Sequence, residues 1–283
     1  MNEIFLNNGG KIPLLGFGVF QITNQEICEQ SVSSALKTGY RMIDTAACYG
    51  NEKAVGRAIQ KSGIDRKEIF LVSKVWIQDA GYEKTKLSFE KTLQNLQTDY
   101  LDLYLIHMPY GDYHGSWRAM EELYEQRKIK AIGVCNFLPD RLEDLILSHK
   151  IKPMVNQIEL HPFCQQKKLR QMMREHTIQP MAWAPFAEGQ NNIFRNVALS
   201  EIGAKYNKTP AQVILRWLLQ SNIVAIPKSV HAERIKENFD ISGFELSLND
   251  MHIVENMDLK QSLILDIQSL DEVKRLHNIH FEQ

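Results

Sequence analysis

The sequence predicts an α/β protein folded as a (β/α)8 TIM barrel, and three observations support this fold. Eight short aliphatic or β-branched runs recur along the 283-residue chain, and amphipathic stretches with helical spacing separate them. The chain is 44% hydrophobic, which is enough for a sizeable core, and its length suits either one barrel or two smaller domains. No low-complexity linker or shift in composition divides it, so we expect a single domain over residues 1–283.

The strands of this barrel follow a predicted β-hairpin. Asn7-Asn8-Gly9-Gly10 interrupts two short apolar runs, and Asn and Gly tolerate the positive φ angles of tight hairpin turns. The barrel strands are then expected near residues 15–17, 41–44, 69–74, 101–106, 131–134, 154–158, 180–183 and 224–227.

Helical stretches are expected between and after these strands. Residues 83–97 carry apolar side chains at helical spacing. Residues 209–220 begin with Thr209 as an N-cap and with Pro210 at the first helical position. Two more helices are expected at 231–239 and 248–257, and the tail after Lys260 is expected to lie on the rim of the barrel.

A doubly wound dinucleotide-binding fold is the rival prediction. Gly16 and Gly18 begin a GxGxxG-like pattern, and Asp44 follows at about the distance of a ribose-binding acid. However, Gln21 stands where the third glycine belongs, and Pro13 interrupts the preceding strand. The eightfold alternation therefore favours the barrel.

The composition excludes several classes of partner. The formal net charge is −1 and the pI is about 6.8, so no overall field attracts nucleic acid or an anionic membrane. No apolar run approaches the roughly 18 residues that a membrane span needs. The first ten residues lack a basic region followed by an apolar stretch, so we expect no signal peptide.

The cysteines indicate the compartment. The four cysteines form no CxxC pair and no zinc-binding spacing, so we expect no metal site. Free thiols in a chain of this length are typical of a reduced, cytoplasmic protein. Their positions are Cys28, Cys48, Cys135 and Cys164.

Four polar residues stand at the ends of three successive predicted strands. Asp44 and Tyr49 follow the second strand, Lys74 ends the third and His107 ends the fourth. Side chains at the carboxyl ends of barrel strands face the active site. Each residue alone is more often a cap, a solvated side chain or a core histidine, but together they predict one catalytic site.

These residue types suggest proton donation to a carbonyl oxygen. A free tyrosine has a pKa of about 10, which is high for an acid that acts near neutrality. We expect the Lys74 ammonium to lower the pKa of Tyr49 and Asp44 to hold Lys74 charged and oriented. His107 is expected to form a hydrogen bond with the same carbonyl oxygen.

Around these residues the chain resembles the aldo-keto reductases. The resemblance runs from Gly16 to about Met257, and within the family the chain looks most like bacterial glyoxal or methylglyoxal reductases and 2,5-diketogluconate reductases. It is carried by GYRMIDTAACYGNEKAVGRAI (39–59), FLVSKVW (70–76), YLDLYLIHMP (100–109), IGVCNF (132–137), VNQIELHP (155–162), AWAPF (182–186) and IPKSVHAERIKEN (226–238).

The resemblance implies a barrel capped at its bottom by the N-terminal hairpin, and a nicotinamide cofactor. Asp44, Tyr49, Lys74 and His107 match the family's catalytic tetrad, with Tyr49 as the proton donor. It also implies an aldehyde or ketone substrate, no nucleic-acid or membrane partner, and a monomer.

The same resemblance implies the residues that hold the cofactor. Lys228, Ser229 and Arg234 match the site of the 2′-phosphate, so NADPH is expected rather than NADH; a point charge, a hydroxyl and a guanidinium fork suit a phosphate. The remaining matches are Asn136 and Gln157 for the carboxamide, Trp183 for stacking on the nicotinamide ring, and Glu237 and Asn238 for the adenine. Without the resemblance, each of these residues would pass as a capping, core or surface residue.

The chain also departs from the family. Cys135 replaces the usual serine of GVSNF, Met108 replaces the common tryptophan after the histidine, and residues 186–195 lack the usual Pro-Leu-Gly continuation. Phe20, Trp76 and Met108 are expected to line the substrate site. Aldehydes and α-dicarbonyls such as methylglyoxal are the expected substrates; a keto-sugar reductase and a slow-turnover NADPH-binding redox sensor remain alternatives.

Overall fold

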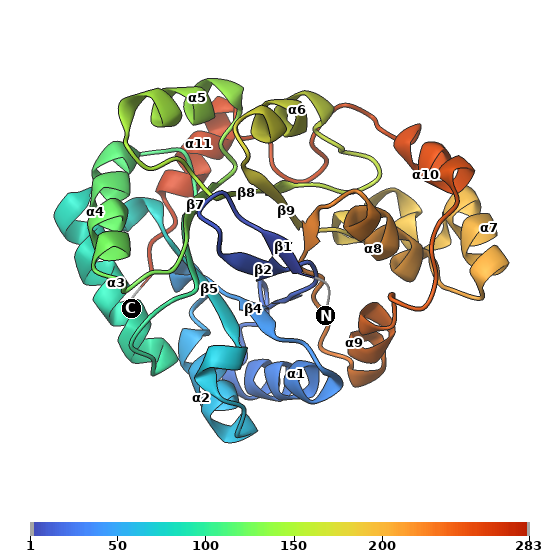
Figure 1. Cartoon of the computed structure of the whole chain (residues 1–283), viewed down its shortest axis with the longest axis horizontal. Coiled ribbons are helices and arrows are strands. Elements are labelled where there is room, and N and C mark those ends of the chain that lie inside the picture. The colour runs from blue at the N-terminus through green and yellow to red at the C-terminus, as the bar shows by residue number, and fades with distance from the viewer. Residues whose placement is uncertain (1–2, 282–283) are drawn as a thin grey trace.

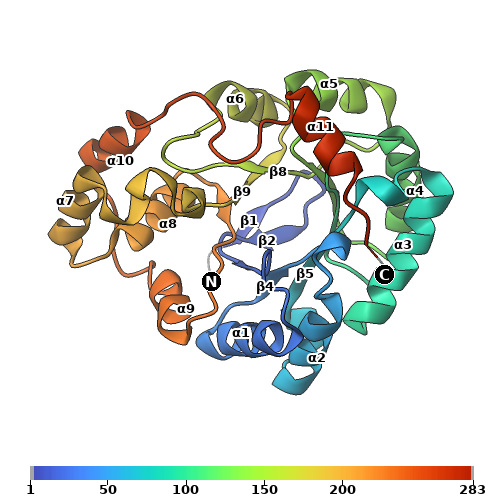
Figure 2. The same ribbon diagram turned by 180° about the vertical axis from the view of Figure 1, so that it is seen from behind.

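An eight-stranded parallel barrel surrounded by helices forms the centre of the molecule, as Figures 1 and 2 show from its two ends. The computed structural model describes residues 3–281. The strands are adjacent in the order β10-β9-β8-β7-β6-β5-β4-β3. The ring closes where Ala225 N donates to Leu14 O and Gly16 N donates to Ala225 O, both at 2.9 Å. The predicted (β/α)8 barrel is confirmed.

The elements occur close to their expected positions. The barrel strands are β3 (Phe17–Gly18), β4 (Met42–Asp44), β5 (Phe70–Val75), β6 (Leu103–Ile106), β7 (Ile132–Cys135), β8 (Val155–Glu159), β9 (Gln179–Trp183) and β10 (Val224–Ala225). The α-helices are α1 (Gln25–Thr38), α2 (Glu52–Ser62), α3 (Tyr82–Leu96), α4 (Tyr113–Glu125), α5 (Pro139–Ser148), α6 (Lys167–Glu175), α7 (Val197–Tyr206), α8 (Pro210–Gln220), α9 (Ala232–Phe239), α10 (Leu248–Glu255) and α11 (Leu270–His277). Short 3₁₀ segments are η1 (Ala47–Tyr49), η2 (Arg66–Glu68), η3 (Ile77–Asp79) and η4 (Ala187–Arg195).

The strands are buried on both faces, which explains their nearly continuous apolar runs. All residues of β6 and β7 are buried, as expected for parallel strands between a barrel interior and a layer of helices. The helix α8 begins as the sequence predicts. The hydroxyl of Thr209 accepts a hydrogen bond from Gln212 N, the Gln212 side chain accepts one from Thr209 N, and Pro210 occupies the first turn.

The predicted hairpin covers the amino-terminal end of the barrel. Strand β1 (Glu3–Phe5) pairs antiparallel with β2 (Lys11–Pro13), and the pair lies in front of the barrel in Figure 1. The side-chain amides of Asn7 and Asn8 donate to the carbonyl oxygens of Pro153 and Lys130, each at 3.0 Å. Both carbonyls precede barrel strands, so this end is the bottom of the barrel.

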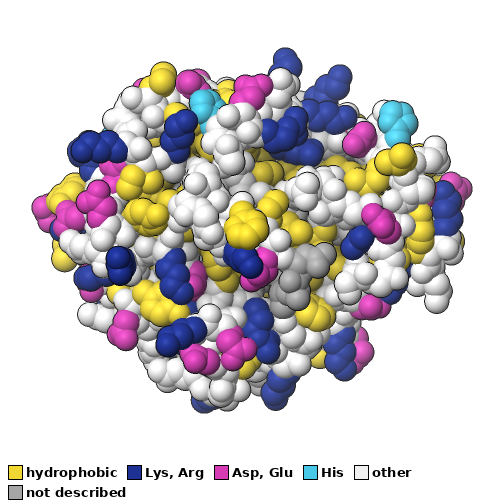
Figure 3. Space-filling model, in the orientation of Figure 1, with side chains coloured by type: hydrophobic (Ala, Val, Ile, Leu, Met, Phe, Trp, Pro, Cys, Tyr) yellow, Lys and Arg dark blue, Asp and Glu magenta, His cyan; other side chains and the backbone are white. Residues whose placement is uncertain are grey.

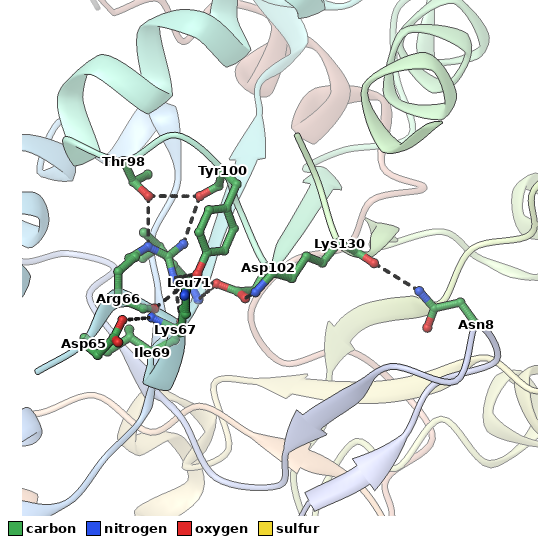
Figure 4. A network of polar contacts seen from close by, with 10 residues as sticks. All are labelled: Asn8, Asp65, Arg66, Lys67, Ile69, Leu71, Thr98, Tyr100, Asp102 and Lys130. Atoms are coloured by element: carbon green, nitrogen blue, oxygen red, sulfur yellow. Dashed lines mark hydrogen bonds and ion pairs between the residues drawn. The ribbon is translucent and has the colours of Figure 1, made fainter. Parts of the chain in front are cut away.

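A closed polar network lies beside the hairpin, and Figure 4 shows it. The Asp102 carboxylate accepts hydrogen bonds from Arg66 Nη1 at 2.8 Å, Leu71 N at 3.0 Å and Lys130 Nζ at 3.0 Å. The ring of Tyr100 is contacted by both cations, with its centroid 4.1 Å from Arg66 Cζ and 4.2 Å from Lys130 Nζ. The network ties the start of β5 to the start of β6 and to the chain before β7.

The chain after Lys260 lies at the opposite end of the barrel, where Figure 2 shows α11 in front. The side chain of Leu276 in α11 is buried against Trp76 and Met108, residues that follow β5 and β6. The tail therefore borders the top of the barrel, as expected, and includes a helix.

The surface shows no single sign of charge. Basic and acidic side chains both occur across the hairpin face in Figure 3, in keeping with the net charge of −1. Among residues 3–281, no helix combines the length and the apolar character that crossing a membrane requires.

Candidate active site

Three neighbouring strands bring the four predicted catalytic residues together at the top of the barrel. Asp44 is the last residue of β4, Lys74 lies near the end of β5, and His107 directly follows β6. Tyr49 ends the 3₁₀ turn η1 after β4. Because β4, β5 and β6 are adjacent and parallel, their carboxyl ends lie side by side. The predicted cluster is therefore present in space.

Lys74 and Asp44 form a buried ion pair. Their side chains are 0% and 2% exposed, and Lys74 Nζ donates to Asp44 Oδ1 at 2.6 Å. Lys74 Nζ also donates to the backbone oxygen of Thr45 at 2.8 Å. The second carboxylate oxygen of Asp44 accepts a hydrogen bond from Gln157 Nε2 at 2.9 Å. Within the described residues Lys74 thus has two acceptors for three N–H donors.

The ring of Tyr49 lies close to the ammonium group of Lys74. The ring centroid of Tyr49 is 5.0 Å from Lys74 Nζ, 5.5 Å from the His107 ring and 4.9 Å from the Phe20 ring. Burial, and then the charge of Asp44, raise the pKa of Tyr49 well above its usual value. The expected lowering of this pKa by Lys74 is therefore outweighed in this structure, because the low-dielectric surroundings and Asp44 dominate.

The surroundings of His107 favour the neutral form of its imidazole. Burial first, and then the positive charge of Lys74, lower the pKa of His107 well below its usual value. Its ring stands edge-on to Trp76, with centroids 4.9 Å apart. The thiol of Cys48 contacts its Nδ1, at a Sγ–Nδ1 distance of 3.4 Å. A neutral ring has one N–H to donate.

The predicted carboxamide and stacking residues form a chain beside the tetrad. Trp183 Nε1 donates to Asn136 Oδ1 at 2.9 Å, and Asn136 Nδ2 donates to the backbone oxygen of His107 at 3.2 Å. Asn136 and Gln157 are buried, whereas Trp183 is half-buried at the end of β9. The thiol of Cys135 lies 3.8 Å from Gln157 Oε1. These polar groups lie at the barrel top with the tetrad.

The predicted phosphate-binding residues flank the start of α9, after β10. Lys228 and Arg234 are exposed and have no hydrogen-bond or ion-pair partner among residues 3–281. Ser229 is buried, and its hydroxyl accepts a hydrogen bond from His231 N at 3.1 Å. Two free cations beside a hydroxyl at a helix start match the needs of a phosphate group.

The predicted adenine-binding residues lie at the end of the same helix. Asn238 is buried, and a carboxylate oxygen of Glu237 accepts a hydrogen bond from Thr209 Oγ1 at 2.7 Å. Glu237 is therefore already engaged with the N-cap of α8.

The predicted substrate-lining residues border the tetrad from different sides. Phe20 is 50% exposed beside Tyr49, whereas Trp76 and Met108 are buried in one small apolar cluster. Trp76 Nε1 donates to the backbone oxygen of Ile279 at 3.1 Å. Tyr110 OH donates to the backbone oxygen of Ile267. The tail thus holds this wall in place.

The structure adds residues that the sequence patterns did not single out. In the sequence Cys48 stands out only as a free thiol, although it directly precedes Tyr49. Tyr110 and Leu276 carry no motif, because their importance comes from contact between the barrel and the distant tail.

The segment that lacks the usual Pro-Leu-Gly folds as the irregular turn η4. Glu188, Asn191 and Asn192 take left-handed backbone angles there, with φ near 50°. Gln21, in the loop after β3, donates through Nε2 to Glu188 Oε1 at 3.3 Å. The segment therefore connects to the loop after the first barrel strand.

Comparison with known proteins agrees with this geometry. The sequence profile of the aldo/keto reductase family matches residues 14–258. The chain is 51% identical over 255 residues to glyoxal reductase of Bacillus subtilis (90% of this chain, 92% of the relative). It is 41% identical over 258 residues to methylglyoxal reductase DkgA of Escherichia coli K12 (90% and 93%).

A solved structure shares the fold of this chain. The crystal structure of a Gox0644 mutant in complex with NADPH superposes with a TM-score of 0.89 at 37% identity, covering 94% of this chain and 96% of that one. With the barrel, the strand-end cluster and these matches together, the chain belongs to the aldo/keto reductase family.

Proposed function

We propose that this protein is an NADPH-dependent reductase that converts small aldehydes and α-dicarbonyls, such as methylglyoxal, to alcohols. The single observation that carries the proposal is the buried Lys74–Asp44 pair beneath Tyr49, with neutral His107 beside it. Membership of the family and the NADPH complex of a structural neighbour support the reaction type and the cofactor.

In this proposal Tyr49 gives its proton to the carbonyl oxygen. A phenol is protonated near neutral pH, and the raised pKa of Tyr49 makes its phenolate depend on stabilisation by a neighbouring charge. Lys74 stabilises the phenolate as it forms, and Asp44 keeps the ammonium in place. His107 donates its single N–H to the same carbonyl oxygen and orients the substrate.

The nicotinamide, when bound, supplies the hydride for the carbonyl carbon. Lys228 and Arg234, which have no partner among residues 3–281, fit with Ser229 the 2′-phosphate that distinguishes NADPH from NADH. The other residues proposed to hold the cofactor are Asn136 and Gln157 at the carboxamide, Trp183 at the nicotinamide ring, and Glu237 and Asn238 at the adenine.

The substrate preference depends on Phe20, Trp76 and Met108. The last two are apolar and buried, which favours compact carbonyl substrates over polyhydroxylated sugars. The resemblance to a glyoxal reductase supports the same choice. A keto-sugar reductase of the 2,5-diketogluconate type is the second candidate, and the half-exposed Phe20 favours it by leaving one side of the site open.

An assay of NADPH absorbance tests the proposal. Glyoxal, methylglyoxal, simple aldehydes and 2,5-diketogluconate are compared, and methylglyoxal is expected to give the highest kcat/KM among them. Tyr49→Phe is expected to lose roughly 10²-fold or more in kcat while it still binds NADPH. Tyr40→Phe is the matched control, because Tyr40 is a buried tyrosine whose hydroxyl donates to Ile235 O away from the tetrad. Tight NADPH binding without turnover of any substrate would instead favour a redox sensor, and an active Tyr49→Phe enzyme would refute the tetrad assignment.

Domain organisation, oligomeric state and location in the cell are also part of the proposed function. We propose that residues 1–283 act as one barrel domain and as a cytoplasmic monomer, without nucleic acid, membrane or metal. Light scattering during size-exclusion chromatography should give the 32.7 kDa mass of one chain, and a dimer mass would contradict this part.

A further inference from the structure

Among residues 3–281, the backbone of His107 forms hydrogen bonds through both its N–H and its carbonyl, whereas its ring has one side-chain contact within hydrogen-bond distance. His107 N donates to Val75 O at 3.0 Å, and its carbonyl oxygen accepts from Asn136 Nδ2 at 3.2 Å. The ring lies between Tyr49 and Trp76, which contact it edge-on. Within residues 3–281, the polar side-chain partner of the ring is the thiol of Cys48, 3.4 Å from Nδ1.

The position of the single imidazole proton decides what this ring does. If the proton is on Nε2, that nitrogen donates to a carbonyl oxygen. If the proton is on Nδ1, Nε2 carries a lone pair and repels the carbonyl oxygen. The orientation of a neutral histidine therefore does not suffice, and its tautomer must also be selected.

Cys48 is equipped to make this selection. Burial raises the pKa of the Cys48 thiol to about 12, despite the opposing charge of Lys74, so the sulfur keeps its proton near neutral pH. Cys48 belongs to η1, whose next residue is Tyr49, and it packs against the cluster of Trp76 and Met108. The thiol is thus fixed beside the ring and has a proton to donate.

We propose that Cys48 is a positioning residue for the carbonyl reduction: its S–H donates to His107 Nδ1 and holds the imidazole proton on Nε2. This inference rests on the proposed role of His107 as a donor to the substrate oxygen. It assigns a task to a side chain outside the group of four proposed catalytic residues. A thiol is a weak donor, so its effect is to bias the ratio of two tautomers that differ little in energy.

Nitrogen-15 spectroscopy of histidine-labelled protein tests the inference directly. The signal of His107 among the nine histidines is identified by its loss in His107→Gln. Wild-type protein and Cys48→Ser, which keeps a donor, should show His107 mainly with its proton on Nε2. Cys48→Ala should show a mixture, with the tautomer ratio shifted about fivefold, the size expected for one weak hydrogen bond.

Kinetics provide the second measurement. Cys48→Ala should lower kcat by about twofold, in step with the fall in the Nε2-protonated fraction, and leave the KM for NADPH unchanged, whereas Cys48→Ser should keep kcat near the wild-type value. Alanine and serine are both smaller than cysteine, so a merely steric role would slow both variants alike and would overturn the inference. A wild-type His107 protonated on Nδ1, or an unchanged tautomer in Cys48→Ala, would also overturn it. If no carbonyl compound is reduced at all, the proposed function fails, and the spectra still decide which nitrogen carries the proton.

Discussion

The two ends of the barrel bury charge in opposite ways. At the bottom, both carboxylate oxygens of Asp102 accept hydrogen bonds, from Arg66, Lys130 and the backbone of Leu71. At the top, the Lys74 side chain is 0% exposed, against 52% for Lys130, and one of its three N–H donors has no acceptor among residues 3–281.

This difference suits the bottom network to stability and, under the proposed function, the top pair to catalysis. In the bottom network each charged group has a partner of opposite charge, and the exposed Lys130 is also solvated. Its charged groups therefore have no unmet hydrogen-bonding demand. The top pair is enclosed by protein and keeps hydrogen-bonding capacity next to the phenol of Tyr49. A buried charge with spare capacity is costly for stability but strengthens electrostatic effects on a reacting group.

The largest effect is expected from replacing the buried lysine. Lys74→Met removes the cation beside Tyr49 and leaves the Asp44 carboxylate without its partner. We expect kcat/KM to fall roughly 10²-fold or more and the free energy of unfolding to fall by about 3–5 kcal/mol. Lys130→Met is the matched control at the bottom, with unchanged kcat/KM and a loss within about 1 kcal/mol in urea unfolding. Equal losses of activity in both variants would erase the distinction between the ends.

The bottom network should matter for stability alone. Asp102→Ala leaves the buried N–H of Leu71 without its acceptor and removes the carboxylate that pairs with Arg66 and Lys130. We expect the free energy of unfolding to fall by about 2–3 kcal/mol while kcat and KM stay at their wild-type values. The exposed Asp99 serves as control, and Asp99→Ala should change stability by less than about 0.5 kcal/mol. A large loss of kcat in folded Asp102→Ala would show that the bottom of the barrel also governs catalysis.

The unpaired arginine at the top should act on cofactor choice and not on folding. Unlike Arg66, Arg234 is exposed and has no partner among the described residues. Arg234→Ala should raise the KM for NADPH about tenfold or more, the size of one lost charged hydrogen bond, and leave the KM for NADH and the Tm unchanged. Lys236→Ala, on the same helix and also exposed, is the control. Equal effects on both cofactors would contradict a 2′-phosphate site.

The smallest effect concerns pH and the burial of His107. The pKa of His107 is lowered well below 6.5 in the folded protein, so the unfolded chain binds the proton first as the pH falls. The stabilisation that comes from burying neutral His107 is fully present above pH 6.5. It is lost as the pH falls below 6.5 towards the pKa of His107 in the folded protein. The loss should approach about 1.4 kcal/mol per pH unit.

Urea unfolding at a series of pH values measures this effect. The slope for His107→Gln should be smaller than that of wild type by this amount below pH 6.5, and the slopes should agree above it. Parallel curves throughout would mean that His107 is not kept neutral by burial.

Much of the barrel and of the site could be predicted because each rests on a local pattern. Alternating apolar runs and amphipathic stretches specify the elements, and the strand-end rule then brings Asp44, Lys74 and His107 to one place. Thr209 and Pro210 fixed the start of α8 in the same local way.

The pKa of Tyr49 could not be predicted in this way. The residue types suggested that Lys74 would dominate, but burial and the Asp44 carboxylate have the larger effect. Depth of burial depends on everything that packs around a side chain, including Phe20 from the first strand loop. The spacing of residues along the sequence carries no information on how deeply a side chain is buried.

The sequence by itself predicted the barrel and the strand-end cluster of Asp44, Lys74 and His107, because these follow from periodicity and from residue types at strand ends. The proposed cofactor-binding residues rest on resemblance to the family instead. Only the tertiary structure decided which charged groups have all their hydrogen bonds satisfied and which, like Lys74, keep an unused donor among residues 3–281. It also placed the Cys48 thiol on His107 and brought Ile279 to Trp76 across more than two hundred positions of the chain. Such contacts depend on distances between side chains that the chain brings together only when it folds.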